Sequence, residues 1–226
     1  MRAVDYPAAQ PAARCLVVFL PGMGDDAEAF ARNGLVEELQ RRGLSIDVVA
    51  ANATIGYYAH GTFAQRLATD VIQPRRARGY QQVWLIGNSM GGFGTLFYAR
   101  QHLSDVTGVL ALAPFLGDKD LIEEIYRAGG LHEWSAPPRV DQLNDKNYQR
   151  ELLRWLQAAT RGQEPAPQLN IGFGDKDKLA RADELLAAVL PAEHVYRESG
   201  GHDWGPWRRL LAQFLDRGPL ATSCGR

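Results

Sequence analysis

The sequence has almost no surplus of charge of either sign. It contains 25 lysine and arginine residues against 26 aspartate and glutamate residues, so its formal net charge is −1. Without a basic excess or a block of like charges, the chain has no electrostatic footprint for a phosphate backbone or an anionic membrane surface. We therefore expect no nucleic-acid partner.

Long apolar runs are also missing. Every apolar run is too short to cross a bilayer, so we expect no membrane span. Residues 1–14 are rich in alanine and proline and lack the charged start, apolar stretch and cleavage site of a secretory signal. Together these features predict a cytoplasmic protein.

Cysteine is scarce, with only Cys15 and Cys224 in the chain. A disulfide between them has no support in the sequence, and two ordinary thiols in a cytosolic protein is the simpler expectation. Metal-ligand spacing is absent as well, because there is no HExxH motif and no cysteine pair, and His202 next to Asp203 is too little for a site. We expect no metal and no cofactor.

What the sequence does contain is an alternation of two patterns over 226 residues, a length that suits one α/β domain. Short continuous apolar runs, typical of strands buried on both faces, alternate with helical spacing. This alternation predicts a mostly parallel sheet with helices on both faces. The predicted strands are residues 15–20, 46–51, 83–86, 106–112 and 169–173, with a weaker one at 194–196, and the clearest predicted helices are 91–102, 179–190 and 204–215.

One stretch, residues 115–167, breaks this alternation. It contains helical pieces, two glycine or proline pairs and two tryptophans, but no convincing strand. Insertions in α/β domains gather at the functional edge, so we interpret this stretch as a small helical cap. The alternative is a set of surface helices with no role in binding. We expect one domain over residues 1–226, ending in a flexible tail over residues 217–226.

A glycine-flanked serine follows the third predicted strand, in the sequence Gly87-Asn-Ser89-Met-Gly91. A serine on a sharp strand-to-helix turn crowds its neighbours, and glycines two residues before and after it relieve that crowding. The turn also places the hydroxyl at a helix N-terminus, which favours a developing anion. Ser89 is therefore the predicted nucleophile; a purely structural turn is the alternative. A phosphate loop is excluded because Phe93 stands where that loop needs lysine.

A serine hydroxyl needs a base, and His202 has the most distinctive setting of the five histidines. It lies in Ser199-Gly-Gly-His202, between the last predicted strand and the last predicted helix. A glycine-flanked loop there can bring an imidazole over the serine turn, in the chain order serine, acid, histidine. We predict that His202 is the base; the alternative is an exposed loop histidine. The others, His60, His102, His132 and His194, have no such setting.

Besides the nucleophile and the base, a catalytic triad needs a carboxylate that accepts the Nδ1–H of His202 and stabilises the imidazolium. Asp175 and Asp177 both follow the strand predicted at 169–173. Asp177 could instead cap the helix that follows, and Asp175 could be a turn residue. The residues themselves leave this choice open.

Two backbone N–H groups should bind the oxyanion. One is that of Met90, directly after the nucleophile, and the other is predicted at Met23, in the glycine-rich loop after the first strand. The same loop has a rival interpretation, because Gly22-x-Gly24-x-x-Ala27 matches a dinucleotide-binding pattern. That site needs an acid at the end of the next strand, where the sequence has Asn52.

In this order, four motifs resemble the α/β-hydrolase family, and in particular small bacterial carboxylesterases of the esterase D-like branch. The motifs are Leu20-Pro-Gly-Met-Gly24, Gly87-Asn-Ser-Met-Gly91, Gly174-Asp-Lys-Asp177 and Gly201-His-Asp-Trp204. The resemblance implies the α/β-hydrolase fold and ester hydrolysis through an acyl-enzyme. It also favours Asp177 as the acid, because the family's acid often lies three residues after a strand-closing glycine.

The sequence departs from this family in two places. Pro21-Gly22 stands where many relatives have His-Gly, although backbone donors should survive that change. The two N-terminal strands of the family are not visible, unless residues 1–10 supply one of them.

The substrate is expected to be a small-molecule ester or thioester. Aromatic residues on the loops and the predicted cap could line an apolar pocket, with ordinary packing as the alternative for each: Tyr57, Tyr58, Phe115, Trp134 and Trp155. The same machinery serves thioesterases, other acyl hydrolases and acyltransferases. A second class is a non-catalytic binding protein that kept the serine turn.

Overall fold

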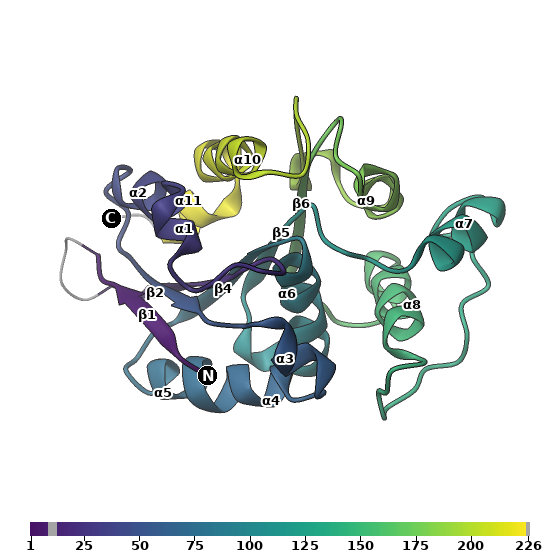
Figure 1. Ribbon diagram of the computed structural model, residues 1–226, viewed down its shortest axis with the longest axis horizontal. Helices are drawn as coiled ribbons and strands as arrows, with labels where there is room; N and C mark the ends of the chain where they lie inside the picture. The colour runs from purple at the N-terminus through teal and green to yellow at the C-terminus, as the bar shows by residue number, and fades with distance from the viewer. Residues whose placement is uncertain (9–12, 225–226) are drawn as a thin grey trace.

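A seven-stranded sheet forms the centre of the computed structural model, which describes residues 1–8 and 13–224 (Figure 1). The strand order is β1-β3-β2-β4-β5-β6-β7, and every neighbouring pair is parallel except the antiparallel pair β1–β3. This confirms the predicted mostly parallel sheet. The strands are β1 (Ala3–Tyr6), β2 (Cys15–Leu20), β3 (Ile46–Ala51), β4 (Gln82–Asn88), β5 (Gly108–Leu112), β6 (Gln168–Gly174) and β7 (Val195–Glu198).

Helices cover both faces of this sheet. Helices α1, α2, α10 and α11 lie on one side of it, and α4, α5 and α6 lie on the other (Figure 1). The helices are α1 (Ala29–Arg32), α2 (Leu35–Gln40), α3 (Ile55–Ala59), α4 (Phe63–Leu67), α5 (Gln73–Arg76), α6 (Met90–Gln101), α7 (Lys119–Arg127), α8 (Tyr148–Thr160), α9 (Ala180–Ala187), α10 (Trp204–Arg217) and α11 (Pro219–Ser223). A π-helical turn, Ala68–Ile72, joins α4 to α5.

The apolar runs form strands because both of their faces are covered. Every residue of β2 and β5 is buried, and only Gln82 of β4 is partly exposed. Helix α6 packs against β4 and β5, while α10 packs against β6 and β7. A strand enclosed by two helical layers shows no alternation of polar and apolar residues, which explains the continuous runs.

The N-terminal residues supply one edge strand. Residues 3–6 form β1, whose backbone pairs with β3, and the side chain of Asp5 in this strand forms an ion pair of 2.8 Å with the buried Arg75. Residues 1–10 therefore do supply a strand of the sheet. Residues 9 and 10 lie outside the described part of the chain.

The expectation of two free thiols was wrong. Cys15, at the start of β2, forms a disulfide with Cys224, and the two residues are 209 positions apart in sequence. The described part of the expected tail is also structured: α10 extends to Arg217, α11 follows, and Leu220 is fully buried. Contacts between residues at opposite ends of the chain leave no local pattern, so the sequence carried no sign of them.

Residues 115–167 form two helices, α7 and α8, which lie together at one end of the molecule (Figure 1). Helix α8 is joined to α6 by a buried ion pair, in which Arg100 contacts Glu151 and Glu151 also contacts Arg154. The Glu151 carboxylate is 1% exposed, and it accepts the backbone N–H of Val140 as well. This network fixes α8 against the helix that follows Ser89.

The sheet order places the loops of interest side by side. From β3 the chain crosses over β2 to form β4, so the order reverses direction between β2 and β4. Leu20 at the end of β2 pairs with Gly87 near the end of β4. In open α/β sheets, ligands bind at such a reversal, outside the carboxyl ends of the strands.

Candidate active site

The turn after β4 holds Ser89 in a strained conformation. Its φ is 55° and its ψ is −116°, which non-glycine residues rarely adopt. The crowding predicted from the glycines is present: a Cβ on Gly91 would lie 1.9 Å from the Leu20 carbonyl oxygen, and a Cβ on Gly87 would lie 2.3 Å from that of Gly91. Only glycine fits at either position, and the turn therefore projects the Ser89 hydroxyl from the end of the sheet.

Hydrogen bonds from β5 and the loop after it hold this turn in place. The Ser89 N–H donates to the Leu112 carbonyl at 2.8 Å, and the Phe115 N–H donates to the Ser89 carbonyl at 3.1 Å. The backbone of Ser89 is thus fixed on both sides, while its hydroxyl remains available for another partner.

The loop that carries Met23 lies beside this turn. Gly24 has a φ of 90°, and the Asp25 N–H donates to the Gly22 carbonyl, which closes the loop as a tight turn. Among the described residues, neither the Met23 N–H nor the Met90 N–H donates to another backbone carbonyl. Both predicted oxyanion donors are accordingly available to a ligand, and the Met23 side chain points outward, 69% exposed.

The three residues predicted as nucleophile, base and acid form one continuous line of hydrogen bonds. The Ser89 hydroxyl lies 2.8 Å from His202 Nε2, and His202 Nδ1 lies 2.9 Å from both carboxylate oxygens of Asp177. The Asp177 side chain is completely buried and that of His202 is 14% exposed. A carboxylate can only accept, so the neutral imidazole donates from Nδ1 and presents Nε2 as the acceptor for the serine hydroxyl.

Asp175, the other candidate acid, occupies a different place. Its carboxylate accepts the Gly200 N–H at 2.9 Å, its own N–H donates to the Glu198 carbonyl, and the Lys176 N–H donates to the Gly200 carbonyl. These bonds tie the loop after β6 to the loop that carries His202. Asp175 therefore fixes the histidine loop and does not contact the imidazole.

Further packing orients the imidazole. The Trp207 ring meets it edge to face, with ring centroids 5.0 Å apart. The Asp203 side chain accepts the Gly205 N–H and so caps α10 directly after the histidine. His202 is held between a helix start and a glycine pair.

A second carboxyl group near Asp177 takes no part in this line. Asp183 on α9 is fully buried, and neither carboxylate oxygen has a hydrogen-bond partner in the described structure. Burial raises its pKa well above the ordinary value, and the charges of Asp177 and Glu184 raise it further. Burial of Asp183 therefore favours its protonated form.

A cavity of about 1050 Å³ opens beside Ser89 and extends along α6. Of the five aromatic residues predicted for a pocket, Tyr58 and Phe115 line it. Tyr57 does not, and Trp134 and Trp155 belong to the buried core, where their indole N–H groups donate to Glu124 and to the Pro165 carbonyl. Trp155 on α8 and Trp134 in the loop after α7 have thus turned inward, because they pack into the same hydrophobic core as the sheet.

The sequence interpretation missed four other aromatic residues of this cavity. They are Phe63, Phe93, Phe97 and Tyr148. The spacing of Phe93 and Phe97 in the helix after the nucleophile was a usable signal, because residues four apart share one helical face.

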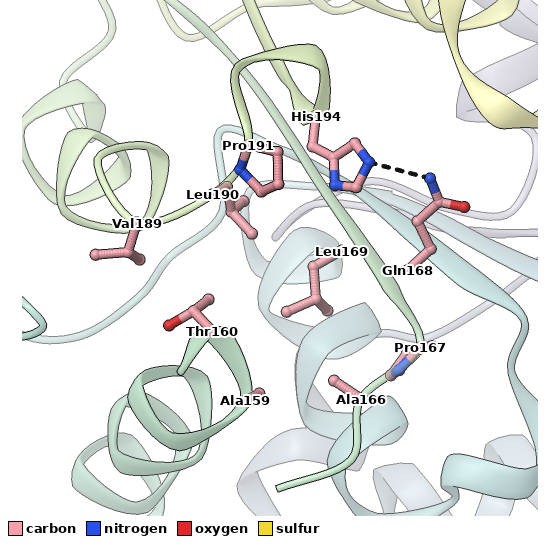
Figure 2. Close-up of a pocket in the computed structure, with 10 residues that line it drawn as sticks. All are labelled: Ala159, Thr160, Ala166, Pro167, Gln168, Leu169, Val189, Leu190, Pro191 and His194. Carbon is pink, nitrogen blue, oxygen red and sulfur yellow. Dashed lines mark hydrogen bonds between the residues drawn. The ribbon is translucent and has the colours of Figure 1, made fainter. Parts of the chain in front are cut away.

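A smaller cavity of about 270 Å³ lies elsewhere, between the end of α8, the start of β6 and the segment before β7 (Figure 2). His194 and Gln168 are hydrogen-bonded at its edge. Gln168 is at the amino end of β6, whereas Asp177 follows the carboxyl end. This cavity is therefore on the opposite edge of the sheet from Ser89.

The described residues, 1–8 and 13–224, contain no group of three or more histidine, cysteine, aspartate or glutamate residues placed to hold a metal ion. Nor do they include a helix whose length and apolar character would let it cross a membrane.

One family of known proteins matches most of the chain. The model of a family described as the alpha/beta hydrolase family matches residues 17–222. No curated protein matches the sequence.

Several solved structures share the fold. S-formylglutathione hydrolase from Staphylococcus aureus is 17% identical, with 94% of this chain and 82% of that chain covered at a TM-score of 0.59. A fluorophosphonate-binding serine hydrolase from the same organism is 14% identical, with 95% and 97% covered at 0.62. Est1E from Butyrivibrio proteoclasticus is 15% identical, with 96% and 93% covered at 0.62.

Proposed function

Because the chain belongs to the alpha/beta hydrolase family, we propose that it hydrolyses carboxylic esters through an acyl-enzyme on Ser89. The observation that carries this proposal is the unbroken line from the Ser89 hydroxyl through His202 to the buried Asp177 carboxylate. A general base within hydrogen-bond reach of a hydroxyl, itself oriented by a third group, is the arrangement that activates a serine.

In the first half of the reaction, Ser89 Oγ attacks the acyl carbon while His202 Nε2 takes the hydroxyl proton. The carbonyl oxygen becomes an oxyanion and accepts the N–H groups of Met23 and Met90. His202 then gives its proton to the leaving alcohol oxygen as the carbon–oxygen bond breaks. The Asp177 carboxylate stabilises the imidazolium between these two transfers.

In the second half, water replaces the alcohol. His202 takes a proton from the water, the hydroxide attacks the acyl carbon, and the same two N–H groups bind the second oxyanion. His202 returns the proton to Ser89 Oγ as the ester bond to the enzyme breaks and the carboxylic acid leaves.

We assign residues 115–167 the role of a cap on this site. The support is that Phe115, Leu143 and Tyr148 of this segment line the cavity beside Ser89. The buried contact of Arg100 with Glu151 makes α8 a fixed wall of the cavity.

Ser89→Ala tests the proposal directly. We expect turnover of p-nitrophenyl esters to fall by a factor on the order of 10⁴ or more, because the nucleophile is lost. Circular dichroism should show an unchanged fold. Retained turnover in this variant would remove Ser89 from the mechanism.

A fluorophosphonate probe separates an enzyme from a binding protein that merely kept the turn. Labelling at Ser89, found by mass spectrometry of the labelled peptide, is expected of an activated serine and should be lost in His202→Ala. Thioesters and esters of the same acyl group, assayed side by side, distinguish an esterase from a thioesterase on the same residues.

The disulfide changes the location that we propose. Disulfides persist in oxidising compartments and are rare in the cytosol, where thiols are kept reduced. We therefore propose that the protein with its Cys15–Cys224 bond works outside the reducing cytoplasm. The test is to extract the protein from its native cells without reductant and to alkylate its free thiols. If both cysteines are alkylated, the disulfide is absent and a cytoplasmic location is favoured instead.

A further inference from the structure

The cavity beside Ser89 is a groove that follows one face of α6. The α6 residues that line it are Met90, Phe93, Phe97 and Gln101, which are spaced three or four apart over the whole helix. A helix rises about 1.5 Å per residue, so the 12 residues of α6 extend the groove by about 18 Å from the nucleophile.

The facing wall runs parallel to α6 and consists of α4, the π-helical turn and α5. At its start, the Phe63 ring is packed so closely against α6 that a Cβ on Gly94 would lie 2.9 Å from it. At its end, Arg76 donates to the Ser104 carbonyl at 2.9 Å, just beyond the end of α6. Ala64, Ala68 and Gln73 of this wall line the groove along the same course.

The lining changes character with distance from Ser89. As far as Phe97 and Ala68 these two walls are apolar except for the exposed Gln65, and beyond them the exposed polar residues Thr69, Gln73 and Gln101 take over. Outside the two walls, the cavity is also lined by Asp141, Asn144, Asp145 and Lys178. The apolar part thus extends from Met90 to Phe97, about 10 Å of helix. A carbon–carbon bond of about 1.5 Å advances an extended chain by about 1.3 Å, so this length matches about eight carbons.

The position of the base shows which part of an ester enters the groove. Ser89 and Met90 line it, whereas His202 does not. His202 must protonate the leaving oxygen, so the alcohol lies on the His202 side of the reacting carbon and the acyl group extends the other way. The groove on that other side is therefore an acyl site.

We propose that the groove along α6 binds an unbranched aliphatic acyl chain and that about eight carbons fill its apolar part. This inference rests on the ester hydrolysis proposed above and names its substrate class. Largely aliphatic and aromatic walls match a flexible apolar chain, and the polar far end sets the length at which further carbons stop gaining burial.

Burial of the chain predicts a defined length profile. Each methylene removed from water favours the bound state by up to about fourfold. We expect kcat/KM to rise by at least about tenfold from p-nitrophenyl acetate to the octanoate and to level off between octanoate and dodecanoate. The inference is overturned if kcat/KM is highest for the shortest esters, does not change with acyl-chain length, or falls as the chain lengthens.

Ala68→Phe tests whether the α6 groove is the cause. A phenyl ring at this position fills the groove between its two walls, so the octanoate-to-acetate ratio of kcat/KM should fall by at least about tenfold. Ala68→Leu, a milder filling, should lower the ratio less. The matched control is Ala188→Phe, at an exposed alanine outside the groove, which should keep the ratio of the unmodified protein.

The outcomes separate this inference from the proposed function. Hydrolysis that depends on Ser89 but shows no preference for octanoate, or an unchanged ratio in a folded Ala68→Phe variant, overturns the acyl groove and leaves ester hydrolysis standing. Absence of turnover with every chain length, together with no fluorophosphonate labelling, overturns the proposed function, and the acyl groove falls with it.

Discussion

The carboxylate of Asp177 binds His202 and the start of the next helix at once. Its Oδ1 lies 2.9 Å from His202 Nδ1 and accepts the Leu179 N–H at 2.8 Å. Of the two roles between which the residues alone could not choose, the side chain of Asp177 is the histidine partner, and it also holds the turn before α9, whose N-cap is Leu179. Asp177 connects the orientation of the imidazole to the backbone that precedes α9.

Asp177→Asn should separate the effect of the negative charge at residue 177 from that of its hydrogen bond to the Leu179 N–H. The amide oxygen can still accept the Leu179 N–H, but the negative charge that stabilises the imidazolium is lost. We expect kcat for an ester to fall by a factor on the order of 10³–10⁴, with the melting temperature nearly unchanged. Steady-state kinetics and thermal unfolding measure the two effects.

Asp175→Asn is the matched control for that substitution. Its amide oxygen can still accept the Gly200 N–H, and the side chain does not contact the imidazole. The loss of kcat should therefore stay below about tenfold. A larger loss for Asp175→Asn than for Asp177→Asn would reverse the assignment of the acid.

Ser89 should be a source of strain that glycine relieves. A non-glycine residue in a sparsely populated backbone region costs about 1–3 kcal/mol, and the unfolded-state entropy of glycine offsets part of the relief. We expect Ser89→Gly to unfold with a free energy about 1 kcal/mol higher than Ser89→Ala, measured by urea denaturation. Both variants lack the nucleophile, so the comparison isolates the backbone.

Ala99→Gly, in the interior of α6, is the control for Ser89→Gly. There the backbone is helical, so glycine should lower stability by about 1 kcal/mol. If glycine changes the free energy of unfolding equally and with the same sign at positions 89 and 99, the conformation of Ser89 stores no strain.

Reduction of the Cys15–Cys224 bond should lower stability strongly. The bond closes a loop of 209 residues in sequence, and the chain-entropy model for a loop of this size gives up to about 5 kcal/mol. We expect dithiothreitol to lower the melting temperature by at least about 5 °C. Cys224→Ala should already melt at the lower temperature and should not respond to dithiothreitol; a response in that variant would point to another cause.

Asp183 should make stability fall as pH rises. Its folded-state pKa is raised, so between the unfolded pKa, near 4, and the folded value the folded chain holds a proton that the unfolded chain releases. Asp183→Asn removes this cost, so we expect it to raise the melting temperature by at least about 2 °C at about pH 8. The gain should be smaller at about pH 4.

The control for Asp183 is its neighbour Glu184, which is ion-paired with Arg197 on the surface at 2.7 Å. Glu184→Gln should raise the melting temperature by less than Asp183→Asn at about pH 8, because an exposed pair contributes little and the Glu184 charge is the smallest of the three causes that raise the pKa of Asp183. A gain for Asp183→Asn that is equal at both pH values would contradict a pKa origin.

Local sequence was sufficient to predict most strands and the turn at Ser89. The run Cys15–Leu20 is continuous because both faces of β2 are buried, and Gly87 and Gly91 are needed because backbone atoms approach their α-carbons. Such constraints act between neighbours in the chain or within one element, so they leave a readable pattern. Chain order then singled out His202 among the histidines, and its catalytic role stays a prediction.

Other features depended on residues far apart in sequence, and only the tertiary structure decided them. It directed Asp177 to the imidazole and Asp175 to Gly200, buried Trp134 and Trp155 in the core, and joined Cys15 to Cys224. The groove along α6 likewise exists only because a second wall runs parallel to that helix. Side-chain direction and long-range contact follow from how whole elements pack, and no local periodicity encodes that packing.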